Sequence, residues 1–577
     1  MGKKEMRITM VTETIIQNII LPTSAYERTR LLYVKGYEGH FPIFLSRGEE
    51  IDFRTFFNLF PSEKYRNYAG LDHVILRLDC KGNPMVEISR YGGNDDSIES
   101  FRYTGDHRIE LGDECLLGMI IKADESDIII NGGYLYSDSE DVSDIHLAHV
   151  ICTYHREKDI TEKLDWICSE CNNNPFMKNH LKVYVIDNGN TLDYHDDCVN
   201  VIKSPNLGGS GGFSRGMMEA INDGISTHLT LNDDDAMLDP ETIRRTMAFY
   251  SLLKDERKET ILGGTIFDKD NPLSVHEAGA FCKSGKLYFN EGMDPTTVEG
   301  CMQVENGLKG DEDDAYIAWC YMSMPCSVVR ENGLSLPVFF QCDDVDFSLR
   351  IRELSKITMC GICVWHPFLK IHSVNKEYFG IRNMLTAMAS NSLMDCSTVK
   401  NAFLNTMVSV GCCRYKTAEA QLKALHDFRT GPERVFGMIE KGYSLFIEYE
   451  ANEPVVEKKL ATRNIVHSKR FNIMTFNGIL FPSIGNLETD MSSYETYLFY
   501  RKGIIYYIMP NGKEAVCKRS LIKAMTLTSK IVWNIVMIMI RRNGINHRYS
   551  KAAVYYSSEK KWSELFEGND TISFKDE

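Results

Sequence analysis

The sequence has no excess of positive charge: its 65 Lys and Arg residues are outnumbered by 80 Asp and Glu residues, and the formal net charge is -15. Proteins that track nucleic-acid phosphates carry a basic surface, so this balance argues against a general nucleic-acid-binding protein. Any site for an anionic ligand must therefore be local, and we expect no nucleic acid among the partners of the chain.

The sequence also lacks segments typical of membrane insertion. Residues 1–6 contain no apolar signal-peptide core, and Met6 breaks the myristoylation pattern. In the C-terminal tail the uninterrupted apolar part, Ile535–Ile540, is far shorter than the roughly 20 residues that span a bilayer. These absences predict a cytoplasmic protein.

No internal repeat or low-complexity block is visible in the 577 residues, and a prior of about 150 residues per domain predicts three or four units. Residues 1–143 contain short β-rich runs separated by Gly, Asn and Asp turns, which predict a β-sandwich or jelly-roll-like accessory domain. The runs are Arg30–Val34, His73–Leu78, Met85–Ile88 and Cys115–Ile121. The polar, acidic stretch Ser137–Asp144 then predicts a linker.

Residues 144–385 alternate strand and helix patterns, which predicts a mainly parallel sheet covered on both faces. The predicted strands are Leu147–Cys152, Lys182–Asp187 and His228–Leu231, and the predicted helices are Asp159–Glu170, Gly212–Asp223 and Pro240–Leu253. Residues 386–577 are predicted to be mainly helical, with helices at Ala389–Leu393, Val399–Val408 and Thr417–His426 followed by mixed segments and a basic, apolar tail. The fold class is therefore α/β.

Seventeen cysteines, many inside apolar runs, fit reduced core thiols better than a disulfide framework. Two C-x-x-C pairs deserve weighing against a zinc site. Cys168 and Cys171 fall near the end of a predicted helix, whereas Cys360 and Cys363 fall in a predicted strand, where they face opposite sides. We expect core packing at both pairs rather than structural zinc.

The chain is organised around Thr227–Pro240, where an alternating strand runs into Asp233, Asp234 and Asp235 before a helix. Asp239 is predicted to cap that helix, with Pro240 at its first position. Acids at the carboxyl end of a strand lie at the edge where open α/β sheets bind ligands. Three adjacent carboxylates repel one another, so Mg²⁺ or Mn²⁺ is a natural partner. The alternative interpretation is a solvated acidic turn.

Two other predicted strands end in polar loops. Thr153–Glu157 follows the first, and its Arg156 can bind a phosphate bidentately. Ile186–Asn190 ends the second, and its Asp187 can accept a hydrogen bond from a base or a ribose. Each is also compatible with an ordinary surface loop.

The glycine-rich stretch Asn206–Gly216 precedes a predicted helix, so its backbone N–H groups and the helix N-terminus favour an anion. It lacks the Lys-Ser/Thr pair of a Walker loop, and it does not follow the first strand, as a Rossmann motif does. The alternative is a flexible linker.

The run Leu336–Arg350 delivers Asp343 and Asp344 to the start of a helix, where one acid can act as a general base while the other biases its pKa or orients substrate. Such an acid pair is also typical of an ordinary helix cap. Cys363–Phe368 is a predicted strand ending in His366, a candidate third metal ligand or a packed histidine.

In order, TYHRE, VIDNGN, NLGGSGGFSRG, LNDDDAMLDP, AWC, CDDVDFSLR and VWHP resemble the family 2 inverting glycosyltransferases of GT-A fold. Among them the resemblance is to the polymerising galactofuranosyltransferases of bacterial cell-wall galactan, and it runs from about Arg30 to about Asn383. It implies a GT-A domain at 144–385 that transfers galactofuranose from a UDP-sugar to a lipid-linked or growing surface glycan.

The resemblance also implies roles for individual residues. The donor-binding set is Arg156, Asp187, Asn206, Asp233 and Asp234; the metal ligands for Mn²⁺ or Mg²⁺ are Asp233, Asp235 and His366; the acceptor side holds Trp319 and Asp343; the catalytic base is Asp344.

Two positions depart from the family pattern: Phe368-Leu369 stands where the family continues with tryptophan, and Gly380 stands where a histidine is expected. Ribosyl, rhamnosyl or pyranosyl transfer is therefore an alternative. A nucleotidyltransferase or sugar-nucleotide pyrophosphorylase is a further one, although such enzymes usually carry their glycine loop after the first strand. A non-catalytic glycan-binding or scaffold protein would not need Asp344 opposite a metal site.

The tail Lys518–Lys551 carries eight Lys and Arg residues without an intervening acid. Within it Leu521–Ile540 predicts a helix with Lys523, Thr526, Lys530 and Asn534 on one stripe and apolar residues elsewhere. We interpret it as a helix lying at the surface of an anionic membrane, which predicts a peripheral protein on the inner face of the cell membrane. The alternative is a core helix, or one in a subunit interface, with which a homo-oligomer is compatible.

Overall fold

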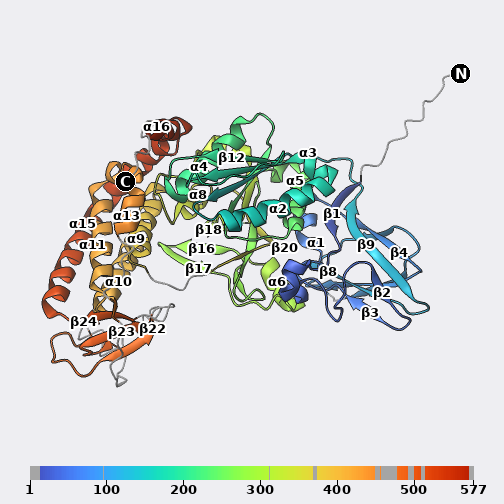
Figure 1. Cartoon of the computed structure of the whole chain (residues 1–577), viewed down its shortest axis with the longest axis horizontal. Coiled ribbons are helices and arrows are strands. Elements are labelled where there is room, and N and C mark those ends of the chain that lie inside the picture. The colour runs from blue at the N-terminus through green and yellow to red at the C-terminus, as the bar shows by residue number, and fades with distance from the viewer. Residues whose placement is uncertain are drawn as a thin grey trace.

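The computed structural model describes residues 13–94, 97–310, 312–367, 373–448, 455–456, 477–490, 499–508 and 514–570. The predictions for the first residues and for Phe368-Leu369 lie outside this set. Along its length the chain passes from two β-sheets near the N-terminus, through a central α/β part, to a group of helices that includes α15 (Figure 1).

The N-terminal part contains two antiparallel sheets whose buried side chains belong to one apolar cluster. The first has the order β1-β9-β4-β7, with β2 beside β9: β1 Thr14–Asn18, β9 Ile128–Ser137, β4 His73–Lys81, β7 His107–Glu110 and β2 Ile43–Leu45. The second has the order β3-β8-β5-β6: β3 Glu50–Asp52, β8 Leu116–Lys122, β5 Met85–Tyr91 and β6 Ile98–Arg102.

Three of the four predicted N-terminal strands lie in β4, β5 and β8. In β4 the buried side chains alternate, as the period of a strand requires. The strand predicted at Arg30–Val34 is wrong, because Ser24–Leu32 forms a 3₁₀ helix. Within this helix Arg30 Nε donates to Glu27 Oε2, one turn earlier, at 3.0 Å. The run Arg30–Val34 does not include Glu27, so its pattern alone could not reveal the helix.

The central sheet has the order β12-β11-β10-β13-β19-β14-β15, with β20 parallel to β14. Its strands are β12 Val199–Lys203, β11 Leu181–Asp187, β10 Leu147–Thr153, β13 His228–Asp233, β19 Met322–Pro325, β14 Ile261–Asp268, β15 Val275–Glu277 and β20 Lys356–His366. From β12 to β13 all neighbours are parallel, whereas β19 runs antiparallel to β13. The prediction of an α/β fold is confirmed.

Helices cover this sheet and connect its strands. They are α2 Glu157–Asn173, α3 Pro175–His180, α4 Gly208–Asn222, α5 Pro240–Leu252, α6 Val298–Glu305, α7 Cys326–Asn332 and α8 Asp343–Arg350. A small sheet of β16 Ala280–Lys283, β17 Lys286–Phe289 and β18 Ala315–Tyr316 lies beside it. Asp239 caps α5 through a bond from the Glu241 N–H at 2.9 Å, as predicted.

Helix α4 begins at Gly208 and not at Gly212, which corrects the predicted boundary. The glycines inside it serve close packing. A Cβ at Gly212 would lie 2.1 Å from Cys152 Sγ, and one at Gly216 would lie 2.1 Å from Val150 Cγ1. Because both neighbours are on β10, the glycines let α4 approach that strand more closely than side chains would allow.

The C-terminal part is built on α9 Val374–Ser390, α10 Cys396–Gly411, α11 Tyr415–Thr430, α12 Pro432–Phe436, α13 Gly442–Glu448, α15 Leu521–Tyr556 and α16 Glu559–Asp570. Residue 385, the predicted end of the α/β domain, lies inside α9. The sequence analysis missed a four-stranded sheet of order β21-β24-β23-β22: β21 Val455–Val456, β24 Glu514–Lys518, β23 Ile504–Ile508 and β22 Leu487–Asp490.

Helix α15 contains the predicted helix Leu521–Ile540 and continues for four further turns. One face, with Leu527, Ile531 and Ile538, packs against α9, α10 and α11. Asn534 was predicted to lie on a polar stripe, but it is buried and accepts a hydrogen bond from Arg429 Nε at 2.9 Å. The opposite face leaves large apolar side chains exposed.

A buried ion pair network joins the N-terminal sheets to α5. Glu241 Oε2 accepts from Arg244 Nε at 2.7 Å, and Glu241 Oε1 accepts from Arg245 Nε at 3.0 Å. The same carboxylate accepts the N–H of Asn18, at the end of β1, at 2.8 Å. Although burial acts in the opposite direction, the two guanidinium groups lower the pKa of Glu241 to about 2.

We expect Glu241→Gln to lower the free energy of unfolding by about 3–5 kcal/mol, since removing one partner leaves the buried charges of Arg244 and Arg245 uncompensated. Because the folded-state pKa of Glu241 is depressed, its contribution is complete above its ordinary pKa of about 4.3 and is lost as the pH falls towards 2. Urea unfolding followed by tryptophan fluorescence at pH 7 measures the difference. The exposed Glu256→Gln is the control, and equal stability of the two variants would contradict the role of the network.

Candidate functional site

A cavity of about 1230 Å³ opens where the parallel strands end. At one end it is lined by residues that follow β10, β11 and β13; at the other it reaches the β16–β17 hairpin and helices α9, α10 and α13. The predicted site residues that line it are Arg156, Asn206, Asp233, Asp234, Trp319, Asp343 and Asp344.

The first acidic group, Asp233 to Asp235, ends β13. Thr153 Oγ1 donates to Asp234 Oδ2 at 2.9 Å, and Arg156 Nη1 lies 2.8 Å from Asp235 Oδ2. Burial, with the charge of Asp235, raises the pKa of Asp234 to about 6 and also raises that of Asp233. Burial opposes ionisation of Asp235 as well, but His366 and Arg156 lower its pKa. Asp233, Asp234 and Asp235 therefore concentrate carboxyl groups beside the cationic side chains of Arg156 and His366.

The predicted metal ligands come together. His366, the last residue of β20, places Nε2 3.3 Å from Asp235 Oδ1, and it shares a second group with Asp233 and Cys320 in which the ligand atoms lie within 4.8 Å of one another. Carboxylate oxygens and an imidazole nitrogen suit Mn²⁺, and the carboxylates also suit Mg²⁺. The donor set thus fits a divalent ion.

The second acidic group begins α8. Val345 N–H donates to Asp344 Oδ1 at 2.7 Å, while burial raises the pKa of Asp344 to about 6 and that of Asp343 well above its usual range. The charge of Asp233 contributes to both shifts, and Asp233, Asp343 and Asp344 line the same cavity. A carboxyl group with this pKa is suited to accept a proton near neutral pH.

The loop that delivers Asp343 is strained and tightly held. Phe339, Gln341 and Cys342 have φ of 72°, 66° and 62°, conformations that side chains other than glycine seldom adopt. Asn383 compensates by donating to the Phe340 carbonyl at 2.6 Å and to the Gln341 carbonyl at 3.1 Å. Asn383, on α9, therefore positions the second acidic group.

Trp319 and the glycine-rich stretch form part of the wall. The Trp319 ring lies edge-on to Phe213 at 5.1 Å and to Phe347 at 6.0 Å between centroids. Asn206 Oδ1 accepts the Gly208 N–H at 3.1 Å, and a Cβ on Gly209 would lie 3.5 Å from Asp343 Oδ2. The first residues of α4, Gly208 and Gly209, therefore line the cavity next to Asp343.

Asp187 stands apart from the other predicted residues. Its carboxylate accepts the N–H of Gly189 at 2.9 Å and that of Leu192 at 2.8 Å, and only 1% of the residue is exposed. It shapes the loop after β11, while its neighbour Asn188 lines the cavity. Its contact with the donor stays a prediction.

Three further titratable residues near the acidic groups, Lys163, Cys320 and Glu277, were not among the predicted site residues. Lys163 Nζ donates to Asn232 Oδ1 at 2.8 Å and to the Asp233 carbonyl, and burial lowers its pKa to about 8. Burial and the charge of Asp344 raise the pKa of Glu277, on β15, to about 8. Only the AWC tract pointed towards Cys320, and no local pattern pointed to the other two.

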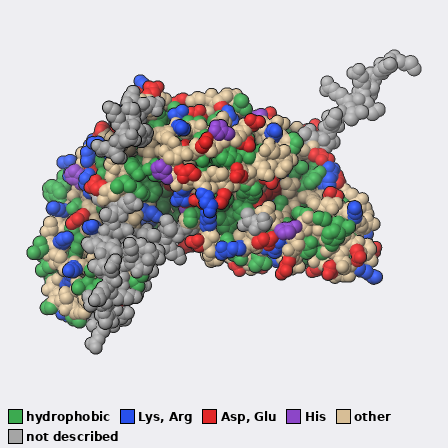
Figure 2. Space-filling model, viewed as in Figure 1, with side chains coloured by type: hydrophobic (Ala, Val, Ile, Leu, Met, Phe, Trp, Pro, Cys, Tyr) green, Lys and Arg blue, Asp and Glu red, His purple; other side chains and the backbone are tan. Residues whose placement is uncertain are grey.

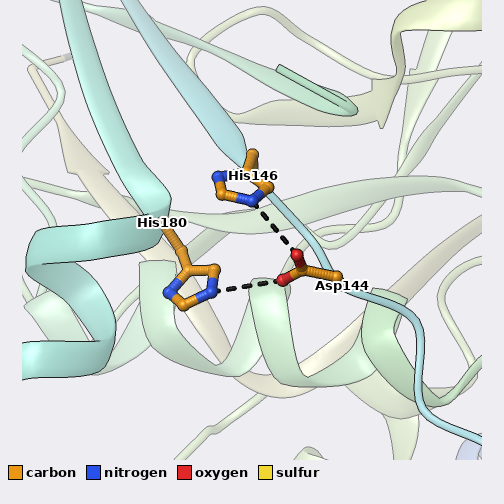
Figure 3. A group of neighbouring side chains, drawn as sticks. All are labelled: Asp144, His146 and His180. Atoms are coloured by element: carbon orange, nitrogen blue, oxygen red, sulfur yellow. Dashed lines mark hydrogen bonds and ion pairs between the residues drawn. The ribbon is translucent and has the colours of Figure 1, made fainter. Parts of the chain in front are cut away.

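A separate group lies at the opposite end of β10. His146 Nε2 is 3.3 Å from Asp144 Oδ2, and His180 Nε2 is 3.2 Å from Asp144 Oδ1 (Figure 3). The two imidazoles reach the carboxylate from the start of β10 and the end of α3. This group belongs to the solvent-exposed surface and not to the cavity, because the Asp144 side chain is 73% exposed.

Comparison with known proteins finds one family and two individual proteins that match the chain. The family described as Galactofuranosyltransferase 2 N-terminal matches residues 16–147. Galactofuranosyltransferase GlfT2 of Mycobacterium tuberculosis is 26% identical over 440 residues, which cover 68% of this chain and 67% of the relative. The chain is close to the bacterial galactofuranosyltransferases. Its enzyme class is that of a glycosyltransferase.

The galactofuranosyltransferase GlfT2 of Mycolicibacterium smegmatis is 24% identical over 440 residues, 68% of this chain and 66% of the relative. The chain thus spans about two thirds of the length of these relatives. A looser likeness, with a TM-score of 0.29 and 13% identity over 53% of this chain and 83% of the other, is to a mannosyltransferase from Pyrobaculum calidifontis in complex with GDP-Man and Mn²⁺. It does not place residues of one chain on the other.

We expect His366→Ala and Asp235→Asn to abolish transfer together with its dependence on a divalent ion. Loss of a partner around a metal costs about 10–100-fold in metal affinity or activity, and loss of a direct ligand should cost at least as much. UDP release is measured with Mn²⁺ and after addition of EDTA. The exposed His195→Ala is the control. Full activity of the unaltered chain in EDTA would rule out the metal assignment.

Proposed function

We propose that the chain is a metal-dependent inverting glycosyltransferase of GT-A type that moves a sugar, best galactofuranose, from a UDP-sugar to a lipid-linked or growing surface glycan. One observation carries this proposal: Asp233, a member of the group of metal-type donors, and Asp344, a buried acid of raised pKa, line the same cavity. The relatives named galactofuranosyltransferase favour UDP-galactofuranose as the donor.

The two acidic groups divide the chemistry. A divalent ion held by Asp233, Asp235 and His366 would neutralise charge on the departing diphosphate. On the other side Asp344 takes the proton from the acceptor hydroxyl, whose oxygen forms a bond to the anomeric carbon as the bond to UDP breaks. The electron pair of that bond leaves with the phosphate oxygen. Attack from the side opposite the leaving group inverts the configuration.

The donor and acceptor occupy different parts of the cavity in this proposal. Arg156, Asn206 and Asp234 surround the nucleotide end, and Asp187 supports the loop beside it. Trp319 and Asp343 border the acceptor next to the base. Beyond them the cavity continues past Lys376 and a polar row on α10, Asn401 and Asn405, which suits a glycan chain rich in hydroxyl groups.

The donor sugar is the least constrained part. Gly380 lines the cavity where the galactofuranosyltransferase pattern has a histidine, so the pocket there is wider. Transfer of a ribosyl, rhamnosyl or pyranosyl group is the alternative within the same fold. Nucleotidyl transfer is disfavoured by the position of the glycine-rich stretch after β12, and a non-catalytic glycan-binding role is disfavoured by the buried acid Asp344.

Membrane contact through α15 completes the proposal, since a lipid-linked acceptor is held at a membrane. In contrast to the expectation drawn from the short run Ile535–Ile540, α15 is, among the described residues, the one helix long and apolar enough to cross a membrane by length and composition. Of its most apolar window, 33% is buried. Because its other face packs against the helical group, we propose that it lies on the inner face of the membrane. Hydrophobic and basic side chains lie side by side over this end of the molecule (Figure 2).

We expect Asp344→Asn to lower the rate of transfer by about 100-fold or more while leaving UDP affinity unchanged, because a general base acts on the chemical step. In the unaltered protein the rate should fall as the pH drops below about 6, where Asp344 becomes protonated and cannot accept a proton. Turnover and calorimetry with UDP measure the two effects, with the exposed Asp313→Asn as control. Loss of UDP affinity would instead assign Asp344 to donor binding.

We expect replacement of Ile522, Trp533 and Ile540 by serine to weaken binding to anionic vesicles by at least about tenfold, since each buried apolar side chain contributes about 1.5–3 kcal/mol. These side chains are 79%, 60% and 74% exposed on α15, so the fold should tolerate the change. Co-sedimentation with phosphatidylglycerol vesicles measures binding. Phe44→Ser with Ile98→Ser, exposed on the N-terminal sheets, is the control. No binding by the unaltered protein at low salt would exclude the membrane role.

A further inference from the structure

Three cysteines and an aspartate meet at the edge of the central sheet, away from the cavity. Cys168 and Cys171 lie in the last turns of α2, and Cys198 directly precedes β12. The Sγ atoms of Cys168 and Cys198 are 3.1 Å apart, and the Cys171 thiol, one helical turn after Cys168, is close enough to Cys198 for the Cys198 side chain to lower the pKa of Cys171. One ligand atom each from Cys168, Cys198 and Asp196 lies within 4.8 Å of the others.

We propose that Cys168, Cys171, Cys198 and Asp196 form a structural zinc site that fastens the end of α2 to the loop between β11 and β12. Three thiolates and one carboxylate supply the four ligands of a tetrahedral zinc ion. The sequence analysis predicted plain core packing for Cys168 and Cys171. The tertiary structure adds two further ligands from residues 25 to 30 positions away.

The local geometry favours a metal over packed thiols. Residues three apart on a helix share a face, so Cys168 and Cys171 both reach the loop. The Tyr194 hydroxyl donates to Cys168 Sγ at 3.6 Å, an outer contact of the kind that orients metal ligands. A disulfide between Cys168 and Cys198 would use two thiols and leave Cys171 beside an acid. Cys168 and Cys171 also belong to an apolar cluster, with Cys198 packed against it, so the metal assignment rests on the distances between the ligand atoms.

The composition of the site selects zinc over the ion of the cavity. Thiolates prefer soft or borderline ions, whereas the oxygen-rich donors around Asp235 suit harder ones. The other candidate group outside the cavity, Asp144 with His146 and His180, contains no thiol (Figure 3). The three groups can therefore be told apart by ligand chemistry as well as by mutation.

The position of the site gives it a structural consequence. Helix α2 begins at Glu157, immediately after Arg156 in the cavity wall, and the loop that ends at Cys198 begins beside Asn188 in the same wall. At the cavity end Thr191 Oγ1 donates to Glu157. A zinc ion would join the end of α2 to the end of the β11–β12 loop, remote from the cavity. It would thereby help to fix the positions of Arg156 and Asn188 in the cavity wall.

The test is the zinc content of the purified full-length chain, expressed with zinc and kept under a thiol reductant. We expect about one tightly held zinc ion per chain, matching a site with four protein ligands. Cys198→Ser and Cys168→Ser should each lower the zinc content at least about tenfold. Cys396→Ser, an exposed cysteine outside the group, should not change it. Unchanged zinc in Cys198→Ser would overturn the proposal.

Two backgrounds separate this site from the others. Cys198→Ser should lower the zinc content equally in a chain that also carries His366→Ala, which removes the cavity ligand. The same loss of zinc is expected in a chain that also carries His180→Ala, which removes the surface group. Cobalt(II) in the Cys320→Ser protein should show a thiolate charge-transfer band that Cys198→Ser abolishes. If the cysteine variants do not fold, the unaltered chain decides: absence of zinc, or a Cys168–Cys198 disulfide found by mass spectrometry of the freshly lysed cells, would contradict the proposal. None of these readouts depends on transferase activity.

Discussion

The crowding of carboxylates at one edge of the central sheet is the constraint on which the site depends. Three acids end β13 and two begin α8, and burial opposes ionisation of each of them. Arg156 and Lys163 offset part of this charge, and the N-terminus of α8 favours the acids it carries. In the proposed function the remaining imbalance favours a divalent ion with a nucleotide diphosphate, and the raised pKa of Asp344 suits it to accept a proton.

Residues remote from the chemistry hold this arrangement. The glycines of α4 let the helix lie against β10, so that its first turn opens under Asp343. Asn383 ties down a backbone that would otherwise relax from its left-handed conformations. On the other face of the sheet the buried carboxylate of Glu241 joins α5 to β1. The fold around the cavity is therefore held by contacts made in all three parts of the chain.

The surface and the edge of the molecule carry separate tasks. Helix α15 uses one apolar face for packing and presents another to the outside, a division that an isolated soluble helix does not need. The cysteine group stabilises the β11–β12 loop in our proposal without touching substrate. In these proposals catalysis, membrane contact and metal-assisted stability rest on different elements, so separate variants test each of them.

Local sequence patterns predicted the α/β alternation, the strands β10, β11 and β13, the Asp239 cap and the acidic groups at strand ends, because periodicity and capping reflect contacts between near neighbours. They did not reveal that Asp187 would accept hydrogen bonds from its own loop, that Asn534 would be buried, or that the thiol of Cys198 would lie beside that of Cys168. Those outcomes depend on partners 5 to 105 residues away. Which of several equivalent polar side chains faces the cavity is decided only when the strands and helices pack, since burial and charge then depend on the whole neighbourhood.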